Sequence, residues 1–294
     1  TSPGGAAADR NGARLDWLGL LLGAAGTLCL LNGMVELHGS DTAQAVVLLV
    51  AAALIFTGFI WWQRHQSANG GAPLMNMALF GFRPFAMGSM VAFIYGTALF
   101  GSTYLLPVYM QLGLNLSASY VGTILLPAGF VLAFTIAGVG RLADKQPTWL
   151  LVGIGLGLLT ASFALMTTIT LTSGLWILVV LSIIGRVGLG FILPSLNLGS
   201  LRPLHESLLS QGSSAISFVR MLGGAIGVSL CGIVLEWRLS VHGDSLVNPV
   251  SSPARLAAFN ESFMMLAALC ALAMLAAWQL REPPSAGAKP AAKD

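Results

Sequence analysis

Two arginines inside long apolar stretches are the residues of this sequence best placed to do chemistry. Arg186 follows a run from Gln146 to Gly185 that contains no charged residue, and Arg220 lies within the next apolar run. If these stretches span a bilayer, each charge costs about 2.5–3.5 kcal/mol or more, which makes each arginine a candidate functional group. The alternative for both is a structural clamp between helices.

Neither arginine has an obvious partner in the sequence. The acids nearest to the apolar stretches stand at their ends, namely Asp16, Glu36, Glu236 and Glu261. The predicted partners are therefore backbone carbonyls, helix C-termini, water or acids from another segment. A second set of polar residues within the stretches is predicted to line a cavity: Tyr95, Tyr104, Gln111 and Asn197. Tyr95, Ser102 and Tyr109 share one face of the third span that could line a cavity, and hydrogen bonding between helices, worth about 0.6 kcal/mol on average, is the alternative for that face.

The composition places these residues in a membrane. Of the 294 residues, 56% are hydrophobic and only 9% are charged, with a mean hydropathy of +0.82. Soluble domains have about 25% charged residues. This excludes a soluble enzyme, a disordered chain and a nucleic-acid binder. The three cysteines lie in apolar stretches without metal-ligand spacing, and common nucleotide, zinc and hydrolase motifs are missing. We therefore predict no enzyme, no cofactor and no metal.

The chain is predicted to be an all-α polytopic membrane protein with eight transmembrane helices. A spanning helix needs about 20 mainly apolar residues. The segments that qualify are 16–35, 42–62, 84–109, 119–140, 148–168, 174–200, 211–236 and 261–280. Most of the tryptophans fall near the ends of these spans, as in an interfacial aromatic belt, namely Trp17, Trp61, Trp62, Trp149, Trp237 and Trp278.

Basic residues predict the orientation. Most of the 14 Lys and Arg residues lie on one side: Arg10, Arg14, Arg64, Arg83, Arg141, Lys145, Arg202, Arg281, Lys289 and Lys293. Only Arg238 and Arg255 lie on the other. The positive-inside rule predicts a cell-membrane protein with both termini of this segment in the cytoplasm.

Three pairs of glycines are predicted to support close contacts between helices. Each pair has the small-xxx-small spacing, at Gly19 and Gly23, at Gly153 and Gly157, and at Gly223 and Gly227.

The spans divide into a pair and a group of six. We predict a cytoplasmic segment at 1–15, two helices within 16–62, a cytoplasmic linker at 63–83, a six-helix unit at 84–280 and a disordered tail at 281–294. Residues 237–260 are predicted to form the longest external loop. The chain begins with Thr1 rather than Met, and we expect it to start within a longer protein.

A short motif indicates a family. Gly138-Val-Gly140-Arg141-Leu-Ala-Asp144-Lys145 joins the second and third helices of the six-helix unit on the predicted cytoplasmic side. It resembles the G-x-L-x-D-R loop that occupies the same place in each half of the major facilitator superfamily. By this resemblance Gly140, Arg141, Asp144 and Lys145 form a cytoplasmic gate motif. Asp144 can cap a helix or pair with an arginine, which would latch two helices in one access state.

Longer segments narrow the resemblance to the fourteen-span drug:proton antiporters of the EmrB/QacA type. The segments that carry this resemblance start with the following residues: Leu15-Asp16-Trp17-Leu18-Gly19, Tyr104-Leu-Leu-Pro107, Gly122-Thr-Ile-Leu-Leu-Pro127, Gly185-Arg186-Val-Gly188 and Arg220-Met-Leu-Gly223-Gly224. The resemblance implies that the first two spans are an extra pair between the halves and that the other six form the C-terminal half. The missing N-terminal six-helix half would carry the acid that exchanges protons.

The predicted function is therefore the C-terminal part of a proton-coupled multidrug exporter working by alternating access. Its partners would be protons, the bilayer, the missing half and a small lipophilic substrate, with cations among the candidates, and no nucleic acid. Two alternatives remain open: export of a lipid, siderophore or metabolite on the same fold, or a membrane scaffold without transport.

Overall fold

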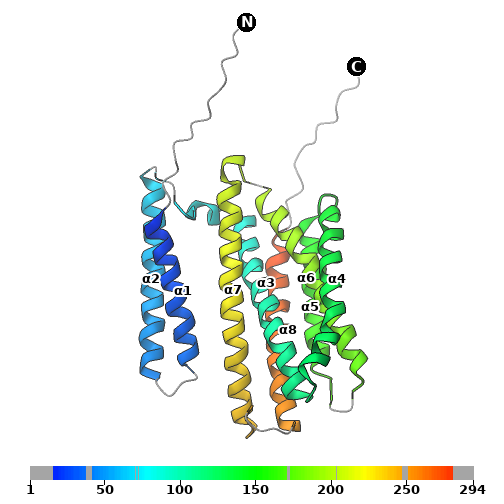
Figure 1. The fold of residues 1–294 in the computed structure, drawn as a ribbon. Helices are drawn as coiled ribbons and strands as arrows, with labels where there is room; N and C mark the ends of the chain where they lie inside the picture. Colours follow the sequence, from blue (N-terminus) through cyan, green and yellow to red (C-terminus); the bar gives the residue numbers. More distant parts are fainter. Residues whose placement is uncertain are drawn as a thin grey trace, which may run out of the picture. The chain divides into compact units, whose positions relative to one another are not determined.

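The computed structural model describes residues 16–37, 42–69, 71, 73–170, 173–202, 204–246 and 251–280, without the side chain of Ser207. These residues form eight helices that are long and apolar enough to cross a membrane, and they contain no strand (Figure 1). The all-α prediction is confirmed. The segments predicted at 1–15 and 281–294 lie outside the described residues. The helices are α1 (Trp17–Glu36), α2 (Thr42–Ala68), α3 (Arg83–Val108), α4 (Ala118–Ala143), α5 (Thr148–Met166), α6 (Leu175–Leu201), α7 (Glu206–Val241) and α8 (Pro253–Trp278).

Three helices extend beyond their predicted ends. Helix α2 continues to Ala68, so the first part of the predicted linker is helical, and a short 3₁₀ helix, η1 (Met77–Gly81), precedes α3. Helices α7 and α8 occupy much of the stretch 237–260 that was predicted to be an external loop. The end of the α7 span and the beginning of the α8 span were predicted at charged residues, Glu236 and Glu261. The structure places Arg238 of α7 against Glu261 of α8, so that each charge is neutralised by the other.

Local signals explain where several helices begin. The side chains of Asp16, Ser117 and Ser252 cap α1, α4 and α8 by accepting backbone N–H groups of the first turn. Proline stands in the first turn of α3 and of α8, where its fixed φ suits the helix and its missing N–H is not needed.

The chain divides into two compact units, residues 1–79 and 80–294. In the first unit a buried hydrogen-bond network ties α1 to the end of α2. The Asp16 carboxylate accepts from Gly19 N at 2.8 Å, Trp62 Nε1 at 2.9 Å and Gln63 Nε2 at 2.7 Å. The Gln63 carbonyl oxygen accepts from the backbone N–H of Met75 at 3.1 Å. Every polar atom of this network that is removed from water therefore gains a partner.

In the second unit α3 is the central helix. It packs against α6, α7 and α8, while α5 packs against α6 and α8, and α4 packs against α6 (Figure 1). Over its most apolar window the span of α3 is 61% buried, compared with 17% for α4. At the end of α3, beyond Pro107, the backbone passes into a π-helical turn, η2 (Tyr109–Gly113).

An aromatic cluster forms the core beside η2. The Tyr109 ring meets Phe259 and Phe263 of α8 edge to face, with ring centroids 5.4 and 5.3 Å apart. Phe263 in turn stacks on Phe163 of α5 at 6.4 Å. Such pairs contribute about 0.5–1.5 kcal/mol each beyond their buried area, so this cluster fixes α8 against α3 and α5.

Glycines allow α3 and α7 to approach at backbone distance. A Cβ at Gly96 would collide with the carbonyl oxygen of Arg220, and one at Gly223 would collide with the backbone of Phe93. The Thr97 hydroxyl donates to the Gly223 carbonyl at 2.9 Å across the same contact. The predicted role of the Gly223 and Gly227 pair in helix packing is confirmed.

The prediction for Gly153 and Gly157 is wrong. A Cβ at Gly153 would meet no atom within 4 Å, and one at Gly157 would only touch the tip of Met274 at 3.9 Å. The close contact of α5 with α6 is made by Gly155, whose Cβ would lie 2.7 Å from the Gly188 carbonyl oxygen. At about 100° per residue, Gly155 faces almost opposite to Gly153, so the spacing rule selected the wrong face.

Candidate functional site

Arg186 projects from α6 toward α3. Each of its two terminal nitrogens lies 3.5 Å from the Thr103 hydroxyl oxygen, at the outer limit of a hydrogen bond. That hydroxyl also donates to the Leu99 carbonyl at 2.7 Å, so it is already engaged. The guanidinium is therefore only loosely held within the described residues.

Arg220 projects from α7 into the same region. The phenol of Tyr95 on α3 is close enough to both guanidinium groups to experience both charges. None of the ion pairs found among the described residues involves Arg186 or Arg220. We call Tyr95, Arg186 and Arg220 the arginine-pair site. Both arginine side chains are half-buried, and a charge without a partner in an apolar environment is costly.

The four residues predicted to line one cavity are not brought together. Tyr95 is only 2% exposed and packs in the core next to the two arginines. Tyr104 is half-buried and lies against α7, where a Cβ at Gly232 would stand 3.9 Å from its hydroxyl. Gln111 lies in η2. Of the four, Asn197 is the one that lines a hollow.

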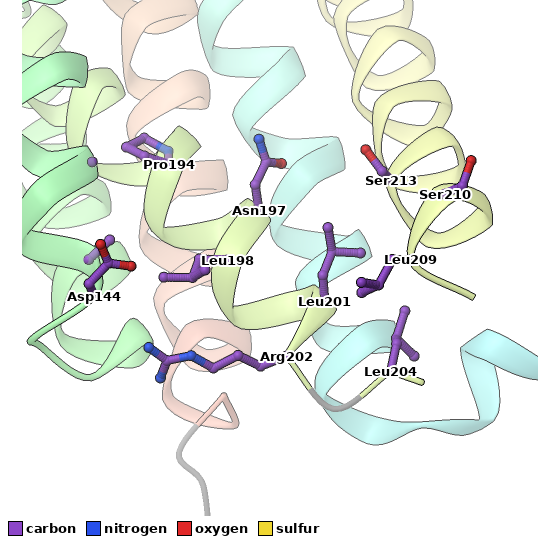
Figure 2. Close-up of a pocket in the computed structure, with 12 residues that line it drawn as sticks. Asp144, Pro194, Asn197, Leu198, Leu201, Arg202, Leu204, Leu209, Ser210 and Ser213 are labelled. Atoms are coloured by element: carbon purple, nitrogen blue, oxygen red, sulfur yellow. The ribbon is translucent and has the colours of Figure 1, made fainter. Parts of the chain in front are cut away.

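That hollow, which we call the α4–α6–α7 hollow, has a volume of about 750 Å³. It lies where the C-terminal ends of α4 and α6 meet the N-terminal part of α7 (Figure 2). Of the predicted gate motif, Gly140 and Asp144 line it, whereas Arg141 and Lys145 are exposed and do not. The structure thus brings Asp144 and Asn197, from separate helices, to one site.

The lining of the hollow is mixed in character. Its walls carry the side chains of Leu198, Leu201, Leu204 and Leu209, with Pro194 further along α6 (Figure 2). Asn197, Ser210 and Ser213 add polar groups, and Figure 2 shows Arg202 extending toward the end of α4 that bears Asp144. An apolar hollow with a few polar groups and one charge of each sign suits an amphipathic small molecule.

Two charged clusters where the C-terminal end of α7 meets the N-terminal part of α8 were missed by the sequence analysis. Arg255 was assigned to an exposed loop, yet it is 1% exposed. It donates to the carbonyl oxygens of Leu112 at 3.1 Å and Ser245 at 2.6 Å, and it pairs with Asp244 at 3.3 Å. It therefore fastens the α7–α8 connection to η2.

The second cluster pairs α7 with α8 directly. Arg238 donates from Nε and Nη2 to the two carboxylate oxygens of Glu261, the latter bond at 2.7 Å. His242 Nε2 lies 3.3 Å from the same carboxylate. The sequence held one usable signal for both clusters, because Ser252-Pro253 is a helix start that would have placed Arg255 and Glu261 on α8.

A chain this apolar, which places two half-buried arginines within its apolar helices and is hollowed at one end, has the construction of a membrane transporter. Comparison with known proteins agrees, and the family is shown by a match of residues 18–228 to the model described as Major Facilitator Superfamily. The chain belongs to that superfamily, whose members are transporters and not enzymes.

Several curated relatives have names that refer to drug resistance. The chain is 28% identical to the multidrug transporter protein MdtP of Bacillus subtilis, over 74% of this chain and 40% of the relative. It is 27% identical to the multidrug resistance protein B homolog of Mycobacterium tuberculosis, over 84% and 47%. It is 26% identical to the lincomycin resistance protein LmrB of Listeria innocua, over 68% and 41%. The chain spans about half the length of the curated relatives it matches.

Proposed function

We propose that this chain is the C-terminal portion of a fourteen-span, proton-coupled multidrug exporter in the cell membrane. In this proposal α1 and α2 are the extra pair between the halves, and α3 to α8 form the second six-helix half. The first half belongs to the rest of the polypeptide. The names of the relatives support the multidrug assignment, and the share of each relative that the chain covers supports the missing half.

The observation that carries this proposal is that Arg186 and Arg220 have no carboxylate partner among the residues that the structure describes. Two cations inside an apolar bundle are expensive unless an acid approaches them. We infer that this acid lies on the N-terminal half and that it exchanges protons. When the acid is ionised it attracts Arg186 and Arg220 across the interface between the halves, and when it is protonated the attraction is lost. Proton binding would thereby change the relative energies of the two access states.

The α4–α6–α7 hollow supports the substrate class. Its leucines offer a surface for the lipophilic body of a compound, while Asn197 and Ser213 offer hydrogen bonds. Asp144 supplies a carboxylate for a cationic group at the rim. Lipophilic compounds, cations among them, fit this lining. The arginine-pair site lies on other helix surfaces and would repel a cation unless the N-terminal half supplies the compensating acid.

The proposed orientation places the hollow on the cytoplasmic side. Arg141, Lys145 and Arg202 all stand at the helix ends around it, on the side that the positive-inside rule assigns to the cytoplasm. A substrate would then leave the inner leaflet or cytosol, pass the gate motif and be released outside after the two halves rock.

Transport by the full-length chain in proteoliposomes tests the proposal. We expect saturable counterflow of a lipophilic cation such as tetraphenylphosphonium, or of lincomycin, and uphill transport when a pH gradient is imposed. A protonophore should abolish uphill transport and leave counterflow intact. Counterflow restricted to a lipid, siderophore or metabolite would select the alternative cargo. The absence of any saturable exchange would leave the scaffold as the function.

A further inference from the structure

An apolar groove runs between α5 and α8 at the end of the bundle where α5 begins and α8 ends. It has a volume of about 520 Å³ and lies between the two neighbouring helices. Four residues of each helix line it: Trp149, Leu150, Gly153 and Ile154 on one side, and Met274, Leu275, Ala277 and Trp278 on the other. Leu275 and Trp278 are 60% and 59% exposed, so the groove opens to the outside of the bundle.

Gly153 creates the groove. A Cβ at this position would meet no atom within 4 Å, so the space above it is left open by the missing side chain and not by a loose helix contact. Gly155, the glycine of α5 that makes the close helix contact, faces α6. The groove is therefore a surface that the packing of the described helices does not use.

In a protein that spans a membrane, an apolar surface that opens outward from the bundle is accessible to lipid acyl chains. The ends of α5 and α8 place the groove at a defined depth. Trp149 is the second residue of α5 and Trp278 is the last of α8, where tryptophans sit at headgroup level. From Trp149 to Ile154 the groove runs about 8 Å along the helix. It would hold the part of an acyl chain that lies next to the headgroup.

Two exposed basic side chains stand at the same end. Arg83 donates to the Gln279 side-chain oxygen at 3.1 Å, which places its guanidinium beside the residue that follows Trp278. Lys145 lies in the short turn that leads into α5. The nearest acid in sequence, Asp144, lines the α4–α6–α7 hollow instead. The apolar groove thus has positive charge beside it at headgroup level.

We propose that the α5–α8 groove binds an anionic phospholipid, with one acyl chain over Gly153 and the headgroup at Arg83 and Lys145. A basic residue near an anionic membrane surface strengthens binding roughly fivefold. The site should therefore prefer an anionic to a zwitterionic lipid with the same chains. This inference depends on membrane insertion and not on transport.

Native mass spectrometry of the full-length protein, titrated with phosphatidylglycerol and with phosphatidylcholine of identical chains, tests the site. We expect one phosphatidylglycerol to be retained at concentrations where phosphatidylcholine is not. Gly153→Leu, whose Cβ meets no atom within 4 Å, should fill the groove and weaken phosphatidylglycerol binding at least fivefold. Gly58→Leu is the matched control, because a Cβ at Gly58 also meets nothing within 4 Å.

A second pair of variants tests the headgroup contact independently of the groove. Arg83→Gln should reduce the preference for phosphatidylglycerol about fivefold, and Arg83→Lys should keep it. Equal retention of the two lipids by the wild type, or unchanged binding by Gly153→Leu, would overturn the proposal. So would a dimer that Gly153→Leu converts to monomer without loss of lipid, because the groove would then be a contact between two copies.

Discussion

At the scale of single residues, Arg186 is a half-buried charge that is held only by long hydrogen bonds. Its only hydrogen bonds in the described part of the chain are two contacts of 3.5 Å to Thr103. A structural clamp would be expected to make short bonds to backbone or carboxylate oxygens, as Arg255 does to Leu112 and Ser245. The contrast with Arg255, which holds segments of the bundle together, favours a role for Arg186 other than a structural clamp.

We expect Arg186→Ala to lower transport at least tenfold while leaving folding intact. Removing a charge without a carboxylate partner relieves desolvation, so the free energy of unfolding should stay within about 1 kcal/mol of wild type or rise. Efflux and thermal unfolding are measured on the same preparation. Thr103→Val serves as the control and should change both only slightly. Normal efflux at normal protein levels in Arg186→Ala would refute the role.

Asp16 shows the opposite situation, a buried charge whose bonds are all made. Burial raises the pKa of Asp16, but hydrogen bonds from Trp62, Gly19 and Gln63 lower it, and the net pKa lies below its ordinary value of 3.8. The carboxylate therefore contributes stability that is present above about pH 4 and is lost as pH falls through the lower pKa of the folded state.

The titration of Asp16 should leave the melting temperature of the wild type in detergent unchanged from pH 7 to pH 5. It should lower the melting temperature below about pH 4. Asp16→Asn should lower the free energy of unfolding by about 1–3 kcal/mol at pH 7, since hydrogen bonds to an ionised carboxylate are lost. It should also lack the acid-dependent fall that Asp16 causes. An identical pH profile in both proteins would show that the network does not stabilise the fold.

At the scale of helices, glycine positions decide which faces come together. Gly96 of α3 and Gly223 of α7 interlock at backbone distance, so even one added carbon displaces a helix. We expect Gly96→Ala to destabilise the protein by about 1–3 kcal/mol, the usual cost of overpacking. Gly122→Ala is the matched control on α4, because a Cβ there meets nothing within 4 Å.

The control should be neutral or stabilising by up to about 1 kcal/mol, because alanine favours helix more than glycine does. Thermal unfolding in detergent measures both variants. Equal effects of Gly96→Ala and Gly122→Ala would mean that the α3–α7 contact is not close.

The sequence predicted the helices better than their ends or contacts. Long apolar runs identify spans because lipid leaves the backbone no alternative to helix. The ends of α7 and α8 were missed because Arg238 and Glu261 satisfy each other across the two helices, which no local pattern reveals. Gly153 and Gly155 belong to the same run of glycines in α5, and which of them meets α6 depends on how the helix is rotated in the bundle.

The candidate site was only partly predicted, because the sequence does not show how the helices are arranged against one another. Arg186, Arg220 and Asp144 could be selected as charges in unusual places. That Asp144 and Asn197 share one hollow, while Tyr95 is packed into the core, follows from the arrangement of α4, α6 and α7 in space. The roles of Arg202 and Ser213 in lining this hollow had no signal in the sequence, since an arginine or serine near a helix end is usually just solvated.

At the scale of the whole molecule, the proposed gate motif must act between access states. We expect Asp144→Asn to slow uphill efflux about tenfold while substrate binding stays nearly unchanged, because the carboxylate would latch helices in one state. Asp144→Glu keeps the charge and should retain most of the activity. Efflux rates and equilibrium binding are compared in proteoliposomes of the full-length protein. Unchanged turnover in Asp144→Asn would remove the gate from the mechanism.

The proposed exporter would need a second six-helix half, and the size of the native polypeptide tests this part of the proposal directly. Six further spans would add about 200 residues, at roughly 20 per span plus connections. An antibody raised against the segment after Leu280 should therefore detect, in the native membrane, a product well above 30.6 kDa. Such a product would provide the acid that Arg186 and Arg220 need. A product of 30.6 kDa would mean that the charges of Arg186 and Arg220 are compensated by a separate subunit, or that the bundle acts as a scaffold without transport.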